Sequence, residues 1–338
     1  MNLHGTIVGE RQQYKYVFCV IKKKIIKSMK HIFVVNPCAG GHDCSQEVAA
    51  RLAGRTDDIE IYVTRGPRDA TCYVADRCRE GGDGELRFYA CGGDGTLNEV
   101  VSGVMSGRSA ACEGRNVAVG CYPCGSGNDY VKYYEDVDFW DIASQLVAPT
   151  VKVDVMKVQS AEGERYAVNT LNFGFEAEVC RNMDEVRRKP LVGGRAAYAT
   201  GIVKSLFTGL HNDCRISVDG EPWFDGMLLL SSLANGRYAG GGFHCAPRSL
   251  NDDGLMEVMA VKPLSVARFA RMIKFYERGE HLDREELRDV VLYCRGQRVT
   301  LEAEQPFFIG IDGELLESKH FEVGNVRQAV NFVVPSLM

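Results

Sequence analysis

Short apolar runs alternate with segments of helical periodicity from residue 31 onward. The apolar runs are typical of buried parallel strands and occupy residues 31–36, 59–64, 86–91 and 117–122. Apolar positions at helical spacing occupy residues 45–52 and 68–79 and the stretch after Thr96. This alternation predicts an α/β domain with a mostly parallel sheet, in which ligands collect at the carboxyl ends of the strands.

The pattern changes after about residue 151, where short strands predominate. They are predicted at residues 151–158, 167–173, 214–218, 227–232, 255–261, 290–293, 297–303, 307–311 and 321–323. Helical patterns are fewer, mainly at residues 195–210 and 265–276. This density of short strands predicts a predominantly antiparallel β-sandwich.

The chain therefore divides into an α/β domain at residues 29–150 and a sandwich domain at residues 151–325. Residues 1–28 form a leader that ends in a basic stretch, and it either contacts anionic headgroups or is a disordered segment before a start at Met29. The sequence leaves open whether residues 326–338 pack back on the first domain.

Composition and charge narrow the class of protein. The 338 residues are 45% hydrophobic and 25% charged, as in an ordinary globular protein. A net charge of −5 gives no basic field for nucleic acid, and no apolar run is long enough to span a bilayer. The 13 cysteines lack the paired spacings of a disulfide scaffold or zinc site, and no signal peptide is evident, so we expect a reduced, cytoplasmic protein.

A glycine turn at residues 92–95 joins a predicted strand to a predicted helix. Such a turn directs backbone N–H groups and the positive end of a helix at an anion, and its glycines permit positive φ angles. Asp94 would repel a phosphate unless a divalent cation or a transferable proton lies between them, which indicates catalysis. The alternative is a plain glycine turn with a solvated Asp94.

Several motifs occur in a fixed order along the chain. They are Asn36-Pro37-Cys38-Ala39-Gly40, Thr64, Gly92-Gly93-Asp94-Gly95-Thr96-Leu97-Asn98-Glu99, Gly125-Ser126-Gly127-Asn128-Asp129, Gly240-Gly241-Gly242, Leu250-Asn251-Asp252-Asp253-Gly254-Leu255 and Ile311-Asp312-Gly313-Glu314. Together they resemble the soluble diacylglycerol kinase catalytic-domain superfamily, which includes bacterial lipid kinases and the sphingosine and ceramide kinases. The resemblance covers nearly the whole chain from Met29 and implies an α/β domain like that of NAD kinase and diacylglycerol kinase, followed by the β-sandwich.

The resemblance implies that the first domain binds ATP. The implied nucleotide-binding residues are Asn36, Pro37, Cys38, Ala39, Gly40, Thr64, Gly92, Gly93, Asp94, Gly95, Thr96, Leu97, Asn98, Ser126, Gly127, Asn128 and Asp129. Many relatives carry a basic residue shortly after the Asn-Pro turn, whereas this chain has Gly41 and His42. Either His42 or a distant arginine substitutes, or nucleotide affinity is lower.

The resemblance also implies a structural Mg²⁺ site at Leu250, Asp253 and Leu255, held through two backbone carbonyls and one carboxylate. An Asn-Asp-Asp-Gly hairpin turn would form without any metal, and this alternative stays open.

Asp312 and Glu314 are jointly expected to supply the general base that a lipid hydroxyl needs. Asp94 and Asp154 are expected to form a magnesium-and-water network around the γ-phosphate. The alternative for Asp312-Gly313 is an ordinary type I′ hairpin turn.

The resulting prediction is an ATP- and Mg²⁺-dependent lipid kinase that phosphorylates a lipid hydroxyl, most simply converting diacylglycerol to phosphatidic acid, transiently at the inner membrane face. We expect the acceptor to enter between the domains, where the apolar face of residues 195–210 and the basic cluster Arg187-Arg188-Lys189 are candidate contacts. The alternatives are an NAD kinase-like enzyme and a catalytically weak nucleotide-binding regulator. The sequence leaves open which lipid is the acceptor and whether the chain forms a homodimer.

Overall fold

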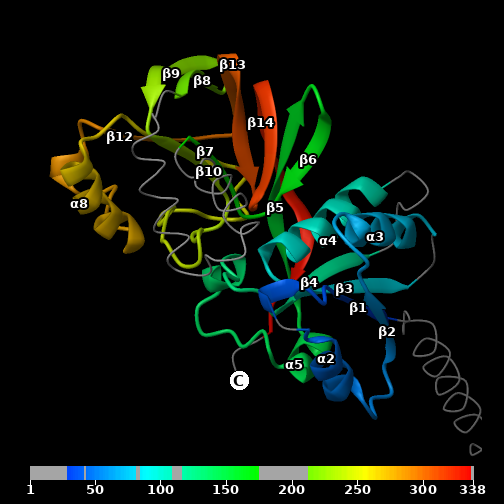
Figure 1. Ribbon diagram of the computed structural model, residues 1–338. Helices are drawn as coiled ribbons and strands as arrows, with labels where there is room; N and C mark the ends of the chain where they lie inside the picture. Colours follow the sequence, from blue (N-terminus) through cyan, green and yellow to red (C-terminus); the bar gives the residue numbers. More distant parts are fainter. Residues whose placement is uncertain (1–28, 42, 81–83, 109–115, 175–211, 336–338) are drawn as a thin grey trace, which may run out of the picture.

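The computed structural model describes residues 29–41, 43–80, 84–108, 116–174 and 212–335 (Figure 1). The leader at residues 1–28, His42, the cluster Arg187-Arg188-Lys189 and the predicted helix at residues 195–210 lie outside the described residues.

The first domain is a parallel sheet with helices on both faces. Its strands are β1 (Met29–Val35), β2 (Asp58–Val63), β3 (Glu85–Gly92) and β4 (Val117–Pro123), in the order β4-β3-β1-β2. Its helices are α2 (Ser45–Leu52), α3 (Asp69–Arg79), α4 (Asp94–Gly107) and α5 (Ile142–Val147), with short 3₁₀ turns η1 (Ala39–Gly41) and η3 (Tyr130–Tyr133).

Side-chain alternation along β1 explains the two helical layers. Ile32 and Val34 point to the face that α3 and α4 cover, whereas Phe33 and Val35 point to the face that α2 and α5 cover. All four side chains are fully buried, so β1 reads as a continuous apolar run rather than as an alternating one.

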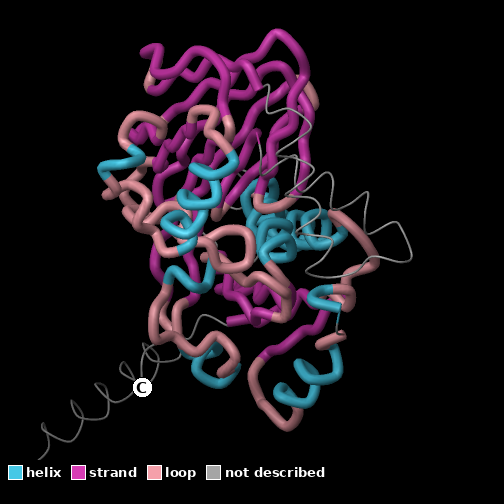
Figure 2. The backbone as a smooth tube through the Cα atoms, turned by 60° about the vertical axis from the view of Figure 1, so that its left-hand side comes forward, coloured by secondary structure: helices cyan, strands magenta, loops and turns pink. Residues whose placement is uncertain are grey.

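The second domain is built almost entirely from antiparallel strands. They are β5 (Thr150–Ser160), β6 (Gly163–Ala167), β7 (Thr170–Gly174), β8 (Asn212–Val218), β9 (Glu221–Leu228), β10 (Leu230–Ala234), β11 (Met256–Val261), β12 (Val291–Gly296), β13 (Arg298–Ile311) and β14 (Glu314–Val333). Helix α8 (Val266–Glu277) packs on a separate apolar cluster beside β10 and β11, and a 3₁₀ turn, η4 (Glu285–Leu287), follows it. Figure 2 shows the long sandwich strands at one end of the molecule and the helix-covered α/β domain at the other.

Strand β14 joins the two domains. Its first half pairs with β13 in the sandwich, and Asn331 and Phe332 near its end pair in parallel with Ala118 and Val119 of β4. Figure 1 shows this strand running from the sandwich into the α/β domain. The sheet is therefore continuous through both domains, with β14 between β13 and β4.

Several predicted strands differ from the observed ones. The predicted strand at residues 167–173 is broken into β6 and β7, because the backbone N–H groups of residues 168–170 turn toward the Asp312 carboxylate. The predicted strands at 297–303 and 307–311 are one strand, β13, with a register shift between Glu302 and Phe307. The short predicted strand at 321–323 is part of the 20-residue β14.

Candidate active site

The two predicted glycine turns contact each other at the ends of β3 and β4. A Cβ atom on Gly125 would lie 2.3 Å from the Gly93 Cα atom, and one on Gly92 would lie 2.2 Å from Thr96 Oγ1. The positive φ angles that glycine permits are not used at Gly92, Gly93 or Gly95. Glycine is required instead because Gly93 and Gly125 pack backbone against backbone and because Gly92 packs against the Thr96 side chain.

Side-chain amides fix the shape of these turns. Asn36 Nδ2 donates to Thr96 Oγ1 at 3.1 Å, which ties the end of β1 to the first turn of α4. Asn128 has φ of 51° and closes the second turn, accepting from Gly125 N and donating to Gly125 O, both at 2.9 Å. Both amide side chains therefore stabilise the turns through hydrogen bonds.

A cavity of about 1100 Å³ lies above the turns and is lined by both domains. Of the predicted nucleotide-binding residues, it is lined by Asn36, Pro37, Cys38, Ala39, Gly40, Thr64, Gly93, Asp94, Gly95, Thr96, Ser126, Gly127 and Asp129. Gly92, Leu97, Asn98 and Asn128 do not line it. Leu97 belongs instead to the apolar core under the sheet.

Asp94 lines the cavity at the start of α4. Its Oδ1 accepts a hydrogen bond from Tyr130 N at 3.1 Å. Burial raises the pKa of this carboxyl above its ordinary value, and the nearby Asp129 adds to the rise, although the Tyr130 N–H opposes it.

Asp129 connects the two domains beside the cavity. Its carboxylate accepts from Lys132 Nζ at 2.6 Å and from Gly241 N of the sandwich domain at 2.7 Å. The loop at residues 240–242 is thereby held against the second glycine turn.

The Asp312 carboxylate accepts four N–H donors. Oδ2 accepts from Asn98 Nδ2 at 2.9 Å and from Val168 N at 2.8 Å, and Oδ1 accepts from Asn169 N at 3.1 Å and from Thr170 N at 2.8 Å. Burial raises the pKa of Asp312 to about 6, although these hydrogen bonds favour the ionised form. A carboxylate has about four lone-pair sites, so Asp312 has little capacity left for a substrate proton.

Glu314 lines the same cavity with an exposed side chain. No group in the described part of the chain donates a hydrogen bond to it. Desolvation by the cavity wall, followed by the negative charge of Glu99, raises the pKa of Glu314 above its ordinary value. Its carboxylate therefore faces the cavity with its oxygens free to accept.

Asp154 is not brought together with the other three predicted catalytic carboxylates. It is fully buried on β5 and does not line the cavity. Its oxygens accept from Gly254 N at 2.6 Å, Asn325 Nδ2 at 3.2 Å and Gln328 N at 2.6 Å. The prediction placed Asp154 with Asp94 in a magnesium-and-water network, but these contacts hold Asp154 inside the sandwich domain.

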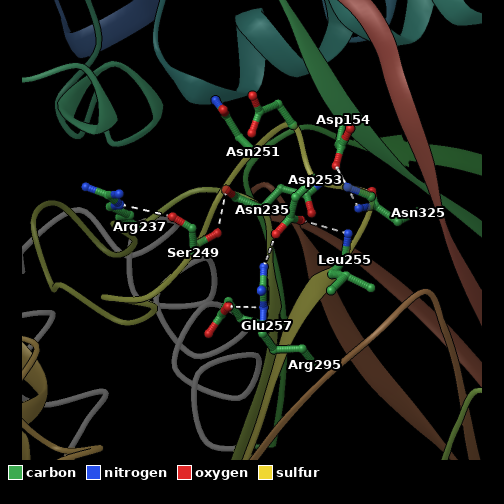
Figure 3. Close-up of polar contacts among 12 residues, drawn as sticks. Asp154, Asn235, Arg237, Ser249, Asn251, Asp253, Leu255, Glu257, Arg295 and Asn325 are labelled. Atoms are coloured by element: carbon green, nitrogen blue, oxygen red, sulfur yellow. Dashed lines mark hydrogen bonds and ion pairs between the residues drawn. The ribbon is translucent and has the colours of Figure 1, made fainter.

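The residues at the predicted structural Mg²⁺ site do not fit the ion well. The Asp253 carboxylate accepts from Leu255 N at 3.0 Å and forms an ion pair with Arg295, as Figure 3 shows. The one side-chain ligand that the motif offers is thus already neutralised. Within the described ranges no group of three or more His, Cys, Asp or Glu side chains is arranged to hold a metal ion.

The structure adds cavity residues that the motifs did not indicate. Arg65, directly after Thr64, is the one basic side chain that lines the cavity among the described residues. Glu99 also lines it and caps α3 by accepting from Arg68 N and Ala70 N.

An apolar wall of the cavity comes from the sandwich domain. It is formed by Leu230, Ala239, Phe243, Phe269, Ala270, Ile273 and Tyr276. The apolar periodicity of residues 265–276 predicted α8, but no sequence signal placed that helix at the cavity.

The site thus combines facing glycine turns of an α/β domain, walls from an antiparallel sandwich and a cavity lined by carboxylates. The profile of the diacylglycerol kinase catalytic domain matches residues 30–158, and that of the YegS C-terminal NAD kinase beta sandwich-like domain matches residues 169–334.

Similar proteins agree with these two profiles. A protein from Chromohalobacter salexigens named "probable lipid kinase YegS-like" is 31% identical over 282 residues, covering 79% of this chain and 86% of that protein. One of the same name from Xanthomonas oryzae pv. oryzae is 27% identical over 296 residues, covering 86% of this chain and 91% of that protein. A crystal structure of a diacylglycerol kinase from Bacillus anthracis has the same fold, with a TM-score of 0.63 at 19% identity, over 90% of this chain and 96% of that one.

The chain belongs to the lipid kinase family that these profiles and relatives define. In the part of the chain that the structure describes, no helix is both long and apolar enough to cross a bilayer.

Proposed function

We propose that this lipid kinase transfers the γ-phosphoryl group of Mg²⁺-bound ATP to the hydroxyl of diacylglycerol. The observation that carries the proposal is the composition of one cavity. Glycine turns line one part of it and an apolar wall lines another. It is also lined by the Glu314 carboxylate, to which no described residue donates a hydrogen bond.

Charge supports the requirement for Mg²⁺. The described lining carries the carboxylates of Asp94, Glu99, Asp129, Asp312 and Glu314 but only one basic side chain, Arg65. A triphosphate would be repelled by this lining unless a divalent cation accompanied it. Bound with ATP, Mg²⁺ would neutralise the developing charge on the phosphates. Asp94, at the N-terminus of α4, is the carboxylate best placed to face it.

Hydrogen bonding separates the roles of the two predicted base residues. Asp312 holds the turn at residues 168–170 against α4 through its four donors, so it positions the wall of the site. Glu314 has free oxygens and a raised pKa, which suits the removal of a proton from a lipid hydroxyl. We assign proton acceptance to Glu314.

The apolar wall supports a lipid acceptor. Phe243, Phe269 and Ile273 line the cavity without any charged group among them, so the acyl part of a lipid would bury its surface there. We further propose that the enzyme works at the cytoplasmic face of the membrane, which it contacts peripherally during catalysis.

The test is transfer of labelled γ-phosphate from ATP to mixed-lipid vesicles that contain diacylglycerol, with and without Mg²⁺. Label in a chloroform-extractable product that comigrates with phosphatidic acid is expected, and only with Mg²⁺. Label in a different lipid would keep the lipid kinase and replace the acceptor. Conversion of NAD⁺ to NADP⁺ in a parallel reaction, with no labelled lipid, would contradict the proposal.

A further inference from the structure

A cluster of charged side chains lies in the sandwich domain, outside the cavity, at the turn where the family resemblance implies a structural metal ion. Arg295 on β12 forms ion pairs with Asp253 and with Glu257, the latter at 2.8 Å (Figure 3). Two carboxylates therefore share one guanidinium.

Strand register places Arg295 there. In the pairing of β11 with β12, Glu257 lies directly opposite Arg295, and Asp253 lies three residues before the start of β11. The Glu257 side chain is only 3% exposed, so its ionised form needs a partner that is present in the folded protein. A cation fixed by the backbone pairing meets this requirement.

The loop at residues 249–255 is fixed by other protein groups as well. Ser249 Oγ donates to Asn235 O at 2.6 Å, Arg237 Nε donates to Ser249 O at 3.1 Å, and Gly254 N donates to Asp154. These partners come from strand β5, which carries Asp154, and from the segment after β10, which carries Asn235 and Arg237 (Figure 3). Each end of the loop is therefore held without a metal ligand.

The same loop reaches the catalytic domain. The Asn251 side chain donates to Tyr134 Oη at 3.0 Å and to Tyr130 Oη at 3.4 Å, and Tyr130 N donates to Asp94. The loop thus supports the segment that holds the Asp94 carboxylate.

From these contacts we propose that Arg295 is the resident cation of this turn: its guanidinium neutralises Asp253 and Glu257 and orders the loop at residues 249–255 in place of a divalent metal ion. The proposal concerns the sandwich domain and is independent of the Mg²⁺ that accompanies ATP.

The test is thermal unfolding of chelator-treated protein, titrated with MgCl₂ alone in the absence of nucleotide. The wild type is expected to show no Mg²⁺-dependent rise in Tm. Arg295→Met is expected to lower Tm by about 5 °C or more, because the buried Glu257 carboxylate and the partly buried Asp253 carboxylate lose their partner. Arg298→Met is the matched control: this arginine is exposed at the start of β13, and its guanidinium has no carboxylate partner among the described residues. Its backbone N–H, which donates to Asp219, is unchanged in the variant, so the Tm should stay near that of the wild type.

In Arg295→Met, Asp253 becomes free, and Mg²⁺ alone should raise Tm saturably, an effect that Asp253→Asn in the same background should abolish. A saturable Mg²⁺ response of the wild type that Asp253→Asn removes would overturn the proposal, as would an Arg295→Met variant no less stable than Arg298→Met. If Arg295→Met does not fold, the wild-type titration with and without Asp253→Asn decides the question alone.

Discussion

Two Asp-Gly turns in the sandwich domain look alike in sequence and differ in what surrounds them. Asp253-Gly254 precedes strand β11, and Asp312-Gly313 follows strand β13. Asp253 is paired with a cation, Arg295, whereas Asp312 accepts four neutral N–H groups and stands beside an open cavity. The partner, which comes from a distant strand or helix, decides whether such a turn is closed or faces a substrate.

The largest expected effect concerns the residue that follows the open turn. Glu314→Gln should lower kcat about 10²–10⁴-fold, because the amide cannot accept the lipid hydroxyl proton. Its Tm should change little, since the side chain is exposed and accepts no hydrogen bond from the described residues. Wild-type activity should fall as the pH is lowered through the raised pKa of Glu314, because only the ionised form is a base. Steady-state phosphoryl transfer measured against pH checks both statements.

Glu317→Gln is the control, because Glu317 is exposed on the same strand and does not line the cavity. Full activity of Glu314→Gln would show that Glu314 does not accept the proton, and the Asp312-Gly313 turn would then be no more catalytic than the Asp253-Gly254 turn.

The sequence predicted the order of elements well and the partners of single residues less well. The glycine turns at residues 92–95 and 125–129 were recognisable because their glycines follow apolar strands directly. The ion pair of Asp253 with Arg295 depends on a strand pairing. Three of the four donors of Asp312 depend on a break between β6 and β7 that the apolar run at 167–173 conceals, and the fourth is the Asn98 side chain on α4. The N–H donors that hold Asp154 away from the cavity come from distant parts of the chain, at Gly254, Asn325 and Gln328, so no local pattern indicated them.

The second largest effect concerns the anchor of the open turn. Asp312→Asn should lower the free energy of unfolding by about 3 kcal/mol, because the amide presents N–H groups to N–H donors in a buried site. Asp219→Asn is the matched control: Asp219 also precedes a glycine and accepts from Gln297 N and Arg298 N, but on an exposed turn, so a loss of no more than about 1 kcal/mol is expected. Denaturant unfolding of both variants measures the difference.

The stability difference between the wild type and Asp312→Asn should depend on pH, with a sign set by the raised pKa of Asp312. Burial raises the pKa of Asp312 to about 6 from an ordinary value of 3.8, so the folded state holds the proton more tightly than the unfolded state. The contribution of this group to stability is complete below about pH 4 and is lost as the pH rises through about 6. The stability advantage of the wild type over Asp312→Asn should therefore shrink between pH 4 and pH 7. An advantage that grows over this range would show that Asp312 is ionised more easily in the folded protein.

The two arginines near these turns, Arg295 and Arg65, also differ in their partners. Arg295 is committed to two carboxylates, whereas Arg65 lines the cavity and forms no ion pair within the described residues. Arg65→Gln should raise KM for ATP about 10–100-fold with a smaller effect on kcat, since a charge-assisted hydrogen bond to phosphate is lost. Arg55→Gln, on an exposed loop and paired with Asp57, should leave KM unchanged. Equal KM values for the two variants would show that another group binds the phosphates.

The smallest expected effect tests the apolar wall, which only the open turn has beside it. Ile273→Ala on α8 removes a partly buried side chain from the cavity lining and should lower kcat/KM for long-chain diacylglycerol about threefold to tenfold. Lys274→Ala, the next residue and exposed, is the control. The loss should shrink with a short-chain diacylglycerol, because less acyl surface is then available to bury against the wall. A loss independent of chain length would mean that α8 supports the fold of the cavity without contacting the acyl chain, and the apolar wall would then be a structural layer like the cluster beneath it.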